Sequence, residues 1–175
     1  MSTGIADKVA LVTGAARPRS IGRATALRLA QEGAHVAALD IAQPYADFPG
    51  HGVAGTDDLE SLVDELEALG VRAIGLQADV TDEGAVGQAV ETVCRELGPV
   101  HLLANVAGGS GAGFGAAPLL DVPRAEFDKV LEVNLTGTFL VSRACASRMI
   151  EHGEGGRIVN VSSQAGKIGW PLLGA

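Results

Sequence analysis

The chain has 175 residues, of which 47% are hydrophobic and 19% charged, so it has the size of one ordinary domain. This composition excludes a disordered chain, and the length is sufficient for a core that needs no disulfide or metal to hold it. A formal net charge of −8 and an aromatic content of only 3% argue against nucleic-acid binding, through phosphates or through stacked bases. Glycine is frequent, with 24 residues and no repeat to explain them, and we expect many tight turns.

Targeting and metal patterns are not found in the sequence. The first residues lack an apolar signal core, and no apolar run is long enough to span a membrane. Cys94 and Cys145 form no metal-binding pattern, and we expect both to be buried in a reducing compartment. We therefore expect a cytoplasmic protein without a membrane partner. The scattered histidines, which we expect to be structural or exposed, are His35, His51, His101 and His152.

Short apolar runs alternate with helical patterns along the chain. The runs predict strands at residues 8–13, 34–40, 71–80, 100–105 and 157–162. Apolar residues at helical spacing, bounded by caps, glycine or proline, predict helices over residues 21–33, 57–69, 82–97 and from about 121 to 150. This alternation is typical of a parallel sheet covered on both faces, so we expect one α/β domain over residues 1–175 with a doubly wound Rossmann sheet.

Polar and glycine residues follow every predicted strand. Ligands of doubly wound sheets bind beyond the carboxyl ends of the strands, and these residues would meet there. They are Thr13 and Gly14, Asp40, Asp79, the segment 105–108, and Ser162 with Ser163.

The segment from Thr13 to Gly22 joins the first strand to the first helix. A helix start offers unpaired N–H groups and a partial positive charge, which suit a pyrophosphate. Gly14 would allow a sharp turn, and Gly22 would allow close approach of backbone or ligand. An ordinary glycine turn before a helix is the alternative explanation.

Asp40, at the end of the second strand, favours a dinucleotide. A carboxylate there can accept hydrogen bonds from both hydroxyls of an adenine-side ribose, and it would repel a 2′-phosphate. We therefore expect NAD, with NADP less favoured. Arg17 and Arg19 point the other way, because either could pair with that phosphate. A solvated acid at a strand end is the alternative for Asp40.

Taken together, these residues resemble the short-chain dehydrogenase/reductase family, over about Lys8 to Ala175. The family's glycine turn, T-G-x-x-x-G-[IL]-G, is matched by Thr13-Gly14 and Ile21-Gly22, with two extra residues between them. Ser20 stands where the middle glycine belongs, and its hydroxyl could donate to the pyrophosphate. The resemblance implies a strand order of 3-2-1-4-5 in the portion present.

The remaining family motifs follow in order. Asp79 and Val80 resemble the segment before the adenine pocket, and Asn105, Ala107 and Gly108 resemble the N-N-A-G segment, with valine replacing the second Asn. The resemblance implies two catalytic residues: Asn134, in a V-N-x-x-G context, which would hold a proton-relay water, and Ser163, which would polarise a substrate carbonyl. From the residues alone, a polar Asn134 within an apolar helix should hold a water or bend the helix, or it is an ordinary satisfied core Asn.

The family's acid/base pair, Tyr-x-x-x-Lys, does not occur in this sequence. The tyrosine is expected thirteen positions after Ser163, one position beyond Ala175, and the only tyrosine present is Tyr45. The resemblance therefore implies that the C-terminal part of the family domain is absent. We expect residues 1–175 alone to bind cofactor without turning over substrate.

A long segment, residues 41–56, separates Asp40 from the next predicted helix. We favour a tolerated surface insertion. The alternative is that the segment is similar to the insertion of the mycofactocin-associated subgroup, which holds NAD tightly.

Two functions stay open. The first is an NAD(P)-dependent oxidoreductase that moves a hydride between nicotinamide and a small alcohol or carbonyl substrate. The second is a non-catalytic NAD-binding or interaction module of the same fold, since a fold does not determine function. The resemblance implies a dimer or tetramer for the full-length protein.

Overall fold

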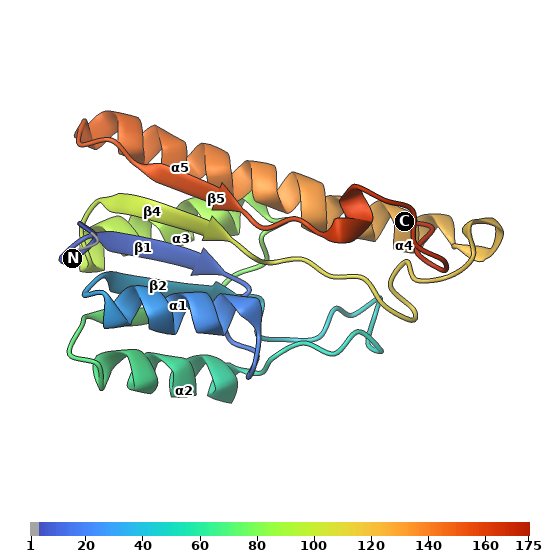
Figure 1. Cartoon of the computed structure of the whole chain (residues 1–175), viewed down its shortest axis with the longest axis horizontal. Helices are drawn as coiled ribbons and strands as arrows, with labels where there is room; N and C mark the ends of the chain where they lie inside the picture. Colours follow the sequence, from blue (N-terminus) through green and yellow to red (C-terminus); the bar gives the residue numbers. More distant parts are fainter. Residues whose placement is uncertain (1–3) are drawn as a thin grey trace.

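In a computed structural model, which describes residues 4–175, the chain forms a five-stranded parallel sheet with helices on both faces (Figure 1). The strands are β1 (Val9–Thr13), β2 (His35–Asp40), β3 (Ala73–Gln77), β4 (Val100–Asn105) and β5 (Arg157–Asn160). Their order is β3-β2-β1-β4-β5, which confirms the expected doubly wound topology. The helices are α1 (Ile21–Gln31), α2 (Thr56–Glu67), α3 (Glu83–Glu96), α4 (Arg124–Leu131) and α5 (Thr138–His152), with short 3₁₀ turns η1 (Leu119–Asp121) and η3 (Gln164–Gly166).

Two strands end earlier than the sequence predicts. The strand expected to reach Val80 stops at Gln77. The N–H of Ala78 still donates to the carbonyl oxygen of Asp40. The Asp79 carboxylate then accepts from the N–H of Thr81, and this hydrogen bond closes a turn that ends the strand. The strand expected to reach Ser162 stops at Asn160. The next residue, Val161, still donates its backbone N–H to the carbonyl oxygen of Asn105 on the neighbouring strand. Both early endings place polar residues in turns beyond the sheet.

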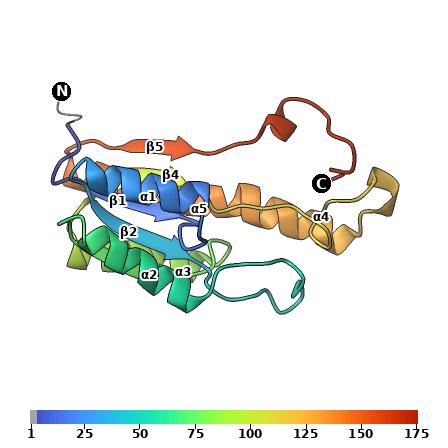
Figure 2. The ribbon, with the colours of Figure 1, turned by 60° about the horizontal axis from the view of Figure 1, so that its bottom comes forward.

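The helix expected from about residue 121 to 150 is divided. A π-helical segment, η2 (Glu132–Gly137), connects α4 to α5. The three segments run on as one long rod that extends past the carboxyl ends of the strands (Figure 2). π-helical turns inside longer helices are frequent at functional sites, and Asn134 lies within η2.

Side chains alternate between two buried layers. Val9 and Leu11 of β1 face the layer that also holds buried residues of α3 and α5, whereas Val12 faces the layer of α1 and α2. Figures 1 and 2 show α1 and α2 on one face of the sheet and α3 and α5 on the other. The period-two alternation of a strand thus divides the apolar residues of β1 between two cores.

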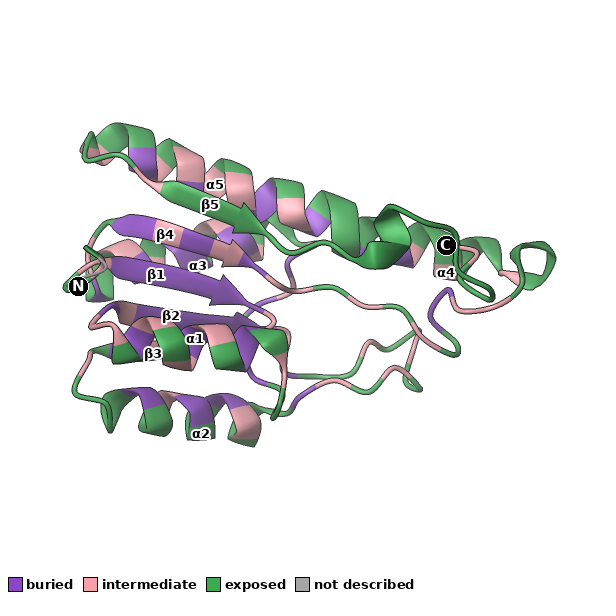
Figure 3. Ribbon diagram, in the orientation of Figure 1, coloured by how far each residue is buried: buried purple, intermediate pink, exposed green. Residues whose placement is uncertain are grey.

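The edge strand β5 departs from the expected covering of both faces. All its residues are exposed, with Val159 at 61% (Figure 3). β4 covers one edge of this strand through the register from Leu102–Arg157 to Asn105–Asn160. The apolar pattern predicted the strand itself, while its burial needs neighbours that residues 4–175 do not supply.

Cys145 is buried, but Cys94 is only half-buried, so the expectation of two buried cysteines is wrong for Cys94. Within residues 4–175, no three His, Cys, Asp or Glu side chains are grouped to hold a metal ion. No helix in the same range is both long and apolar enough to cross a membrane.

The packing of β4 gives a first prediction. Leu103 is 2% exposed, and Leu103→Ala removes a core side chain that the surrounding strands and helices cannot replace. We expect the free energy of unfolding to fall by about 2–5 kcal/mol, measured by chemical denaturation. The matched control is Leu120→Ala, since Leu120 is 97% exposed, and we expect a change below about 0.5 kcal/mol. Equal losses in the two variants would contradict the described core.

Candidate functional site

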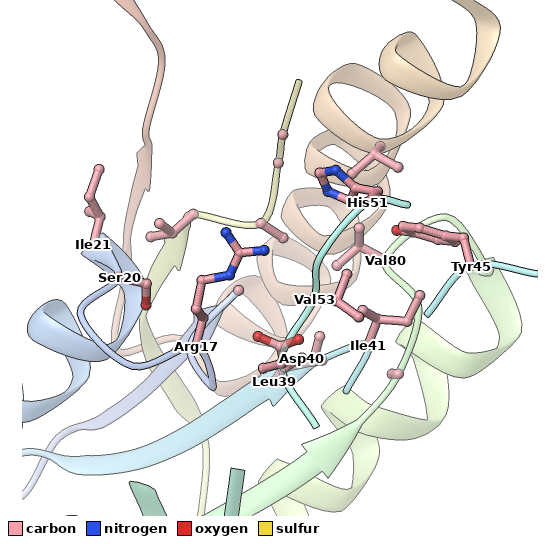
Figure 4. A pocket seen from close by; sticks show the side chains of 18 of the residues that line it. Arg17, Ser20, Ile21, Leu39, Asp40, Ile41, Tyr45, His51, Val53 and Val80 are labelled. Atoms are coloured by element: carbon pink, nitrogen blue, oxygen red, sulfur yellow. The ribbon is translucent and has the colours of Figure 1, made fainter. Parts of the chain in front are cut away.

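A cavity of about 290 Å³ lies beyond the carboxyl ends of β1, β2 and β4 (Figure 4). This is the edge at which the sequence places its polar and glycine residues. Eight of the predicted site residues line the cavity: Gly14, Arg17, Ser20, Ile21, Asp40, Val80, Ala107 and Gly108.

The turn after β1 brings backbone segments unusually close. Gly14 has a φ of +64°, and a Cβ there would stand 2.8 Å from the backbone of Ala107. At Gly22, a Cβ would collide with the carbonyl oxygen of Gly14. Both glycines are thus required by backbone contacts, and Gly22 acts from behind the turn rather than from the cavity wall.

Thr13, the last residue of β1, connects two loops of the site. Its side chain is buried, and its Oγ1 accepts from the N–H groups of Val106 and Ala107, each at 3.0 Å. These bonds fix the start of the loop after β4 against the turn after β1. The two loops therefore form one continuous wall of the cavity.

Ser20 begins α1 as its N-cap. Its Oγ accepts from the N–H of Arg23 at 3.0 Å, and Ser20 also lines the cavity. Since a hydroxyl can donate as well as accept, its proton stays available to a ligand. The free N–H groups of the first turn of α1 and the partial positive charge of its N-terminus suit an anionic group.

Asp40 is held firmly at the end of β2. It is 8% exposed, and its two carboxylate oxygens accept from Ala16 N at 2.9 Å and from Ala42 N at 3.1 Å. Each carboxylate oxygen has a second lone pair. The carboxylate is therefore oriented by the backbone and still has acceptor capacity on the cavity side, where Figure 4 shows it.

Five predicted site residues do not line the cavity: Gly22, Asp79, Asn105, Asn134 and Ser163. Asp79 lies between two lining residues, Ala78 and Val80, and its Oδ1 accepts from Thr81 N and Thr81 Oγ1. Asp79 therefore lies next to the cavity wall in the turn after β3, but it does not line the cavity itself.

Asn105 serves as a buried tie between strands and helix. Its Nδ2 donates to Ser142 Oγ of α5 at 2.8 Å and to Asn160 Oδ1 of β5 at 2.9 Å. Its Oδ1 is buried and has no hydrogen-bond partner among residues 4–175. The amide thus holds β5 and α5 to the end of β4.

Asn134 is fully engaged inside η2. Its Oδ1 accepts from Gly109 N at 3.0 Å, and its Nδ2 donates to Gly109 O at 2.8 Å and to Val130 O at 2.9 Å. Its own carbonyl accepts from Thr138 Oγ1 at 2.9 Å. The side chain thus donates to the Val130 carbonyl where the helix widens, and it fixes Gly109 through two hydrogen bonds. Both protons of its amide are therefore already in hydrogen bonds.

Ser163 is the N-cap of η3. The side chain is exposed, and its Oγ accepts from Ala165 N at 3.2 Å. The hydroxyl proton is free to donate. The structure therefore places Ser163 in the turn after β5 and not in the wall of the cavity.

The segment after β2, residues 41–55, is here called the strap. It extends past the strands (Figure 2), and two of its rings stack on Phe114 of the loop after β4. Tyr45, His51, Val53 and Ala54 of the strap line the cavity. These four residues form part of the cavity wall, while the favoured interpretation of the segment as a tolerated surface insertion stays a prediction.

A ring cluster holds the strap in place. Phe114, from the loop after β4, is completely buried. The His51 ring stacks on the Phe114 ring, with 4.0 Å between the two ring centroids. Tyr45 stacks at 6.1 Å and Phe48 meets the same ring edge-on at 5.7 Å. Lys129 of α4 places its ammonium 4.5 Å from the Tyr45 ring centroid. Aromatic contacts thus connect the strap to two other elements.

Burial changes the ionisation of two strap residues. Burial, followed by the negative charges of Asp79, Glu132 and Asp40, raises the pKa of Tyr45 well above its ordinary value. Burial and the positive charge of Arg17 lower the pKa of His51. At neutral pH, Tyr45 is therefore a protonated phenol and His51 a neutral imidazole.

The other histidines have structural partners, as expected. His101 Nδ1 accepts from Val9 N, His35 Nδ1 accepts from Arg72 N, and His152 Nε2 lies 3.1 Å from Val100 O.

Sequence reasoning missed several residues that shape the site, namely Thr13 as a loop anchor, Arg23 behind the turn, and the ring cluster of Tyr45, Phe48, His51 and Phe114. Since only 3% of the residues are Phe, Trp or Tyr, the occurrence of Tyr45 and Phe48 in the strap and of Phe114 in the loop after β4 is a usable signal. Arg23 stands directly after Gly22, which matches the last glycine of the family's turn, and nothing in its spacing indicates what it contacts.

Comparisons with known proteins agree with this geometry. A sequence model described as short chain dehydrogenase matches residues 8–175. The chain is 42% identical to the cyclohexanol dehydrogenase of Rhodococcus sp. (strain TK6) over 161 residues, which cover 91% of this chain and 57% of that protein. It is 34% identical to the sorbitol dehydrogenase of Cereibacter sphaeroides over 167 residues, which cover 95% and 57%.

Solved structures of similar fold contain NAD. The carveol dehydrogenase of Mycobacterium avium in complex with NAD matches with a TM-score of 0.89 and 32% identity, over 97% of this chain and 59% of that one. An NAD+-bound xylitol dehydrogenase matches with a TM-score of 0.83 and 38% identity, over 98% and 58%. The chain thus spans less than two thirds of the length of these relatives.

The ring cluster generates a prediction about the strap. Phe114→Ala removes the ring on which His51 and Tyr45 stack, so the strap should open more often. We expect hydrogen exchange of strap amides, such as the His51 N–H that bonds to Phe48 O, to accelerate about tenfold or more relative to amides of β1.

The matched control is Phe127→Ala on α4, whose ring is 37% exposed and has no contact in the cluster. It should leave strap exchange unchanged. Strap exchange in Phe114→Ala that equals that of the control would show that the rings do not hold the strap.

Proposed function

The chain belongs to the short-chain dehydrogenase family, and from this premise we propose that it is the NAD-binding portion of an alcohol dehydrogenase or ketoreductase. The matching cyclohexanol and sorbitol dehydrogenases and the NAD-bound carveol dehydrogenase support this class of reaction. The substrate would be a small alcohol or carbonyl compound.

One observation carries the proposal. A single cavity joins the N-terminus of α1, which suits a pyrophosphate, to the carboxylate of Asp40, which suits a ribose. Ser20 adds a hydroxyl donor at the first of these places, and Gly14 and Gly108 keep the wall free of side chains. The residues present therefore fit a dinucleotide.

The same residues favour NAD over NADP. The Asp40 oxygens are held by Ala16 and Ala42, so the carboxylate cannot swing away from a ligand without breaking backbone hydrogen bonds. A 2′-phosphate placed against it would meet a fixed negative charge. Arg17, which also lines the cavity, would then serve the pyrophosphate or the adenine side rather than a 2′-phosphate.

The strap is proposed to slow release of the bound cofactor. Its residues close the cavity from the side of Val53 and Ala54, and Phe114 holds His51 against the segment at Gly109. A dinucleotide in the cavity would have to displace these contacts to leave. The loop after β4 and the strap would then act together on the cofactor.

NAD supplies hydride transfer at its nicotinamide ring when bound, and the protein supplies position and polar contacts. Ser163 would donate its free hydroxyl proton to the substrate oxygen. Asn134 would hold the loop through Gly109, and a relay water would have to use the remaining lone pair of its Oδ1 or its carbonyl. Tyr45 cannot serve as the acid/base, because its raised pKa keeps the phenol protonated near neutral pH.

A second candidate is a non-catalytic NAD-binding module. It is favoured by one observation: Asn134 and Ser163, the two residues predicted to be catalytic, do not line the cavity. NAD binding without turnover in the gene product that includes any residues past Ala175 would support this candidate. Turnover in that product would support the dehydrogenase.

The assembly and location remain part of the proposal. Apolar side chains are exposed along α4, η2 and α5, with Leu135 at 65% and Phe139 at 56%. Such a surface supports a dimer or tetramer through this helical rod. The two free cysteines support a cytoplasmic location.

Asp40 provides the test of cofactor choice. Asp40→Asn removes the charge and one acceptor, and since charged hydrogen bonds contribute roughly 1.5–3 kcal/mol, the Kd for NAD should rise about tenfold to a hundredfold. The preference for NAD over NADP should shrink as well. Isothermal titration calorimetry with both dinucleotides measures the two effects.

Asp64→Asn is the matched control, because Asp64 is an exposed acid on α2 away from the cavity. It should leave both Kd values unchanged. If Asp40→Asn binds NAD as tightly as the control does, the ribose assignment is wrong.

The chain of 175 residues should bind NAD and leave alcohols unoxidised. Without a Tyr-x-x-x-Lys pair among these 175 residues, the family's own acid/base group for the alcohol proton is missing. NADH absorbance during incubation with cyclohexanol, sorbitol and other small alcohols, with calorimetric NAD binding as the positive control, measures this. Sustained NADH formation by the purified chain would contradict the assignment of the acid/base role to the family's tyrosine.

A further inference from the structure

Arg23 is a buried cation in the first helical turn of α1, and it lies behind the turn that follows β1. The residue is 8% exposed, and its backbone N–H donates to the Ser20 N-cap. A buried guanidinium is tolerated only when its donors are satisfied. The acceptors of Arg23 come from two separate segments, the turn after β1 and helix α2.

The first segment is the turn. Arg23 Nη1 donates to Ala16 O at 3.0 Å. The N–H of Ala16 in turn donates to Asp40 Oδ2 at 2.9 Å. Ala16, which is completely buried, therefore connects the guanidinium to the carboxylate through its own backbone groups.

The second segment is α2. Nη1 also donates to Asp58 O at 3.0 Å, while Nη2 donates to Ser61 Oγ at 3.2 Å and Glu65 Oε1 at 2.9 Å. The Asp58 side chain accepts from Gly55 N, where the strap ends. Arg23 thus fixes the turn against the helix that anchors the strap.

We propose that Arg23 is a positioning residue for the cofactor, which acts through Ala16 to hold the Asp40 carboxylate in its ribose-binding orientation. The inference rests on the proposed NAD-binding function. Without the guanidinium, the buried carbonyl of Ala16 loses a donor, and the turn must shift to find another. The shift would withdraw the Ala16 N–H from Asp40 and free the carboxylate to rotate.

A purely structural role is the alternative. Arg23 would then stabilise the packing of α1 on α2, partly through an ion pair with Glu65, whose side chain is 49% exposed. Loss of that contact would lower the melting temperature and affect all cofactor contacts alike. The two roles differ in whether the effect of Arg23 depends on Asp40.

The experiment is a double-mutant cycle of Arg23→Met with Asp40→Asn, read by calorimetric Kd values for NAD and NADP. In the unaltered background, Arg23→Met should raise the Kd for NAD about tenfold and lower the NAD-over-NADP preference. In the Asp40→Asn background, the same change should raise the Kd less than about twofold, because the group through which it acts has already been altered.

Arg28→Met is the matched control, since Arg28 lies on the same helix with its side chain 70% exposed. It should leave both Kd values unchanged. If Arg23→Met does not fold, Arg23→Lys keeps the charge without the planar fork that reaches both Ala16 and α2. That variant should show the same dependence on Asp40, with a Kd increase of about threefold or more.

Equal Kd increases in the two backgrounds, or a lower melting temperature with unchanged Kd values, would overturn the positioning role alone. Failure of the unaltered chain to bind NAD would overturn the proposed function, and this inference with it.

Discussion

A buried carboxylate at the end of β2 is the group on which the arrangement of the site depends. Asp40 is 8% exposed, and a charge in such a place requires partners. Those partners are the backbone N–H groups of Ala16 and Ala42. Ala16 belongs to the turn that leads into α1, and Ala42 opens the strap. One carboxylate therefore sets the position of two segments that enclose one side of the cavity.

The opposite wall depends on β4. Thr13 Oγ1 accepts from Val106 N and Ala107 N, and the lack of a side chain at Gly14 lets these segments touch. Farther along the same loop, Asn134 pins Gly109 and Phe114 receives the rings of the strap. The loop after β4 is thus anchored at three places by three different elements. A cavity with both walls tied in this way is prepared for its ligand before the ligand arrives, which lowers the entropic cost of binding.

Much of the fold was predictable from the sequence. Buried parallel strands have near-continuous apolar runs, and helices that cover them have one apolar stripe, so the elements and the nucleotide-binding fold class could be inferred. The polar residues at the strand ends followed from the geometry of a parallel sheet, which directs all carboxyl ends to one edge. Asp40 and Gly14 could be expected in the cavity for that reason.

Other features depend on contacts between distant residues and leave no local pattern. The strap meets Phe114 across more than sixty positions of chain, and no periodicity indicates such a pairing. Arg23 has the spacing of an ordinary helical residue, and only the fold brings Ala16 and α2 to it. The apolar surroundings of Asn134 in the sequence indicated a polar side chain that needs partners, but neither the π-helical turn nor the bond to Gly109 could be read from them. The exposure of β5 shows the same limit, because an apolar pattern predicts a strand and only its neighbours decide its burial.

The central claim is that the cavity at the carboxyl ends of the strands binds NAD with Asp40 against the ribose. A crystal structure of the chain grown with NAD tests it most directly. We expect both adenine-side ribose hydroxyls within hydrogen-bond distance of the Asp40 carboxylate, the pyrophosphate at the N-terminus of α1, and the strap closed over the adenosine. Density for NAD elsewhere, or in the cavity with its ribose turned away from Asp40, would contradict it.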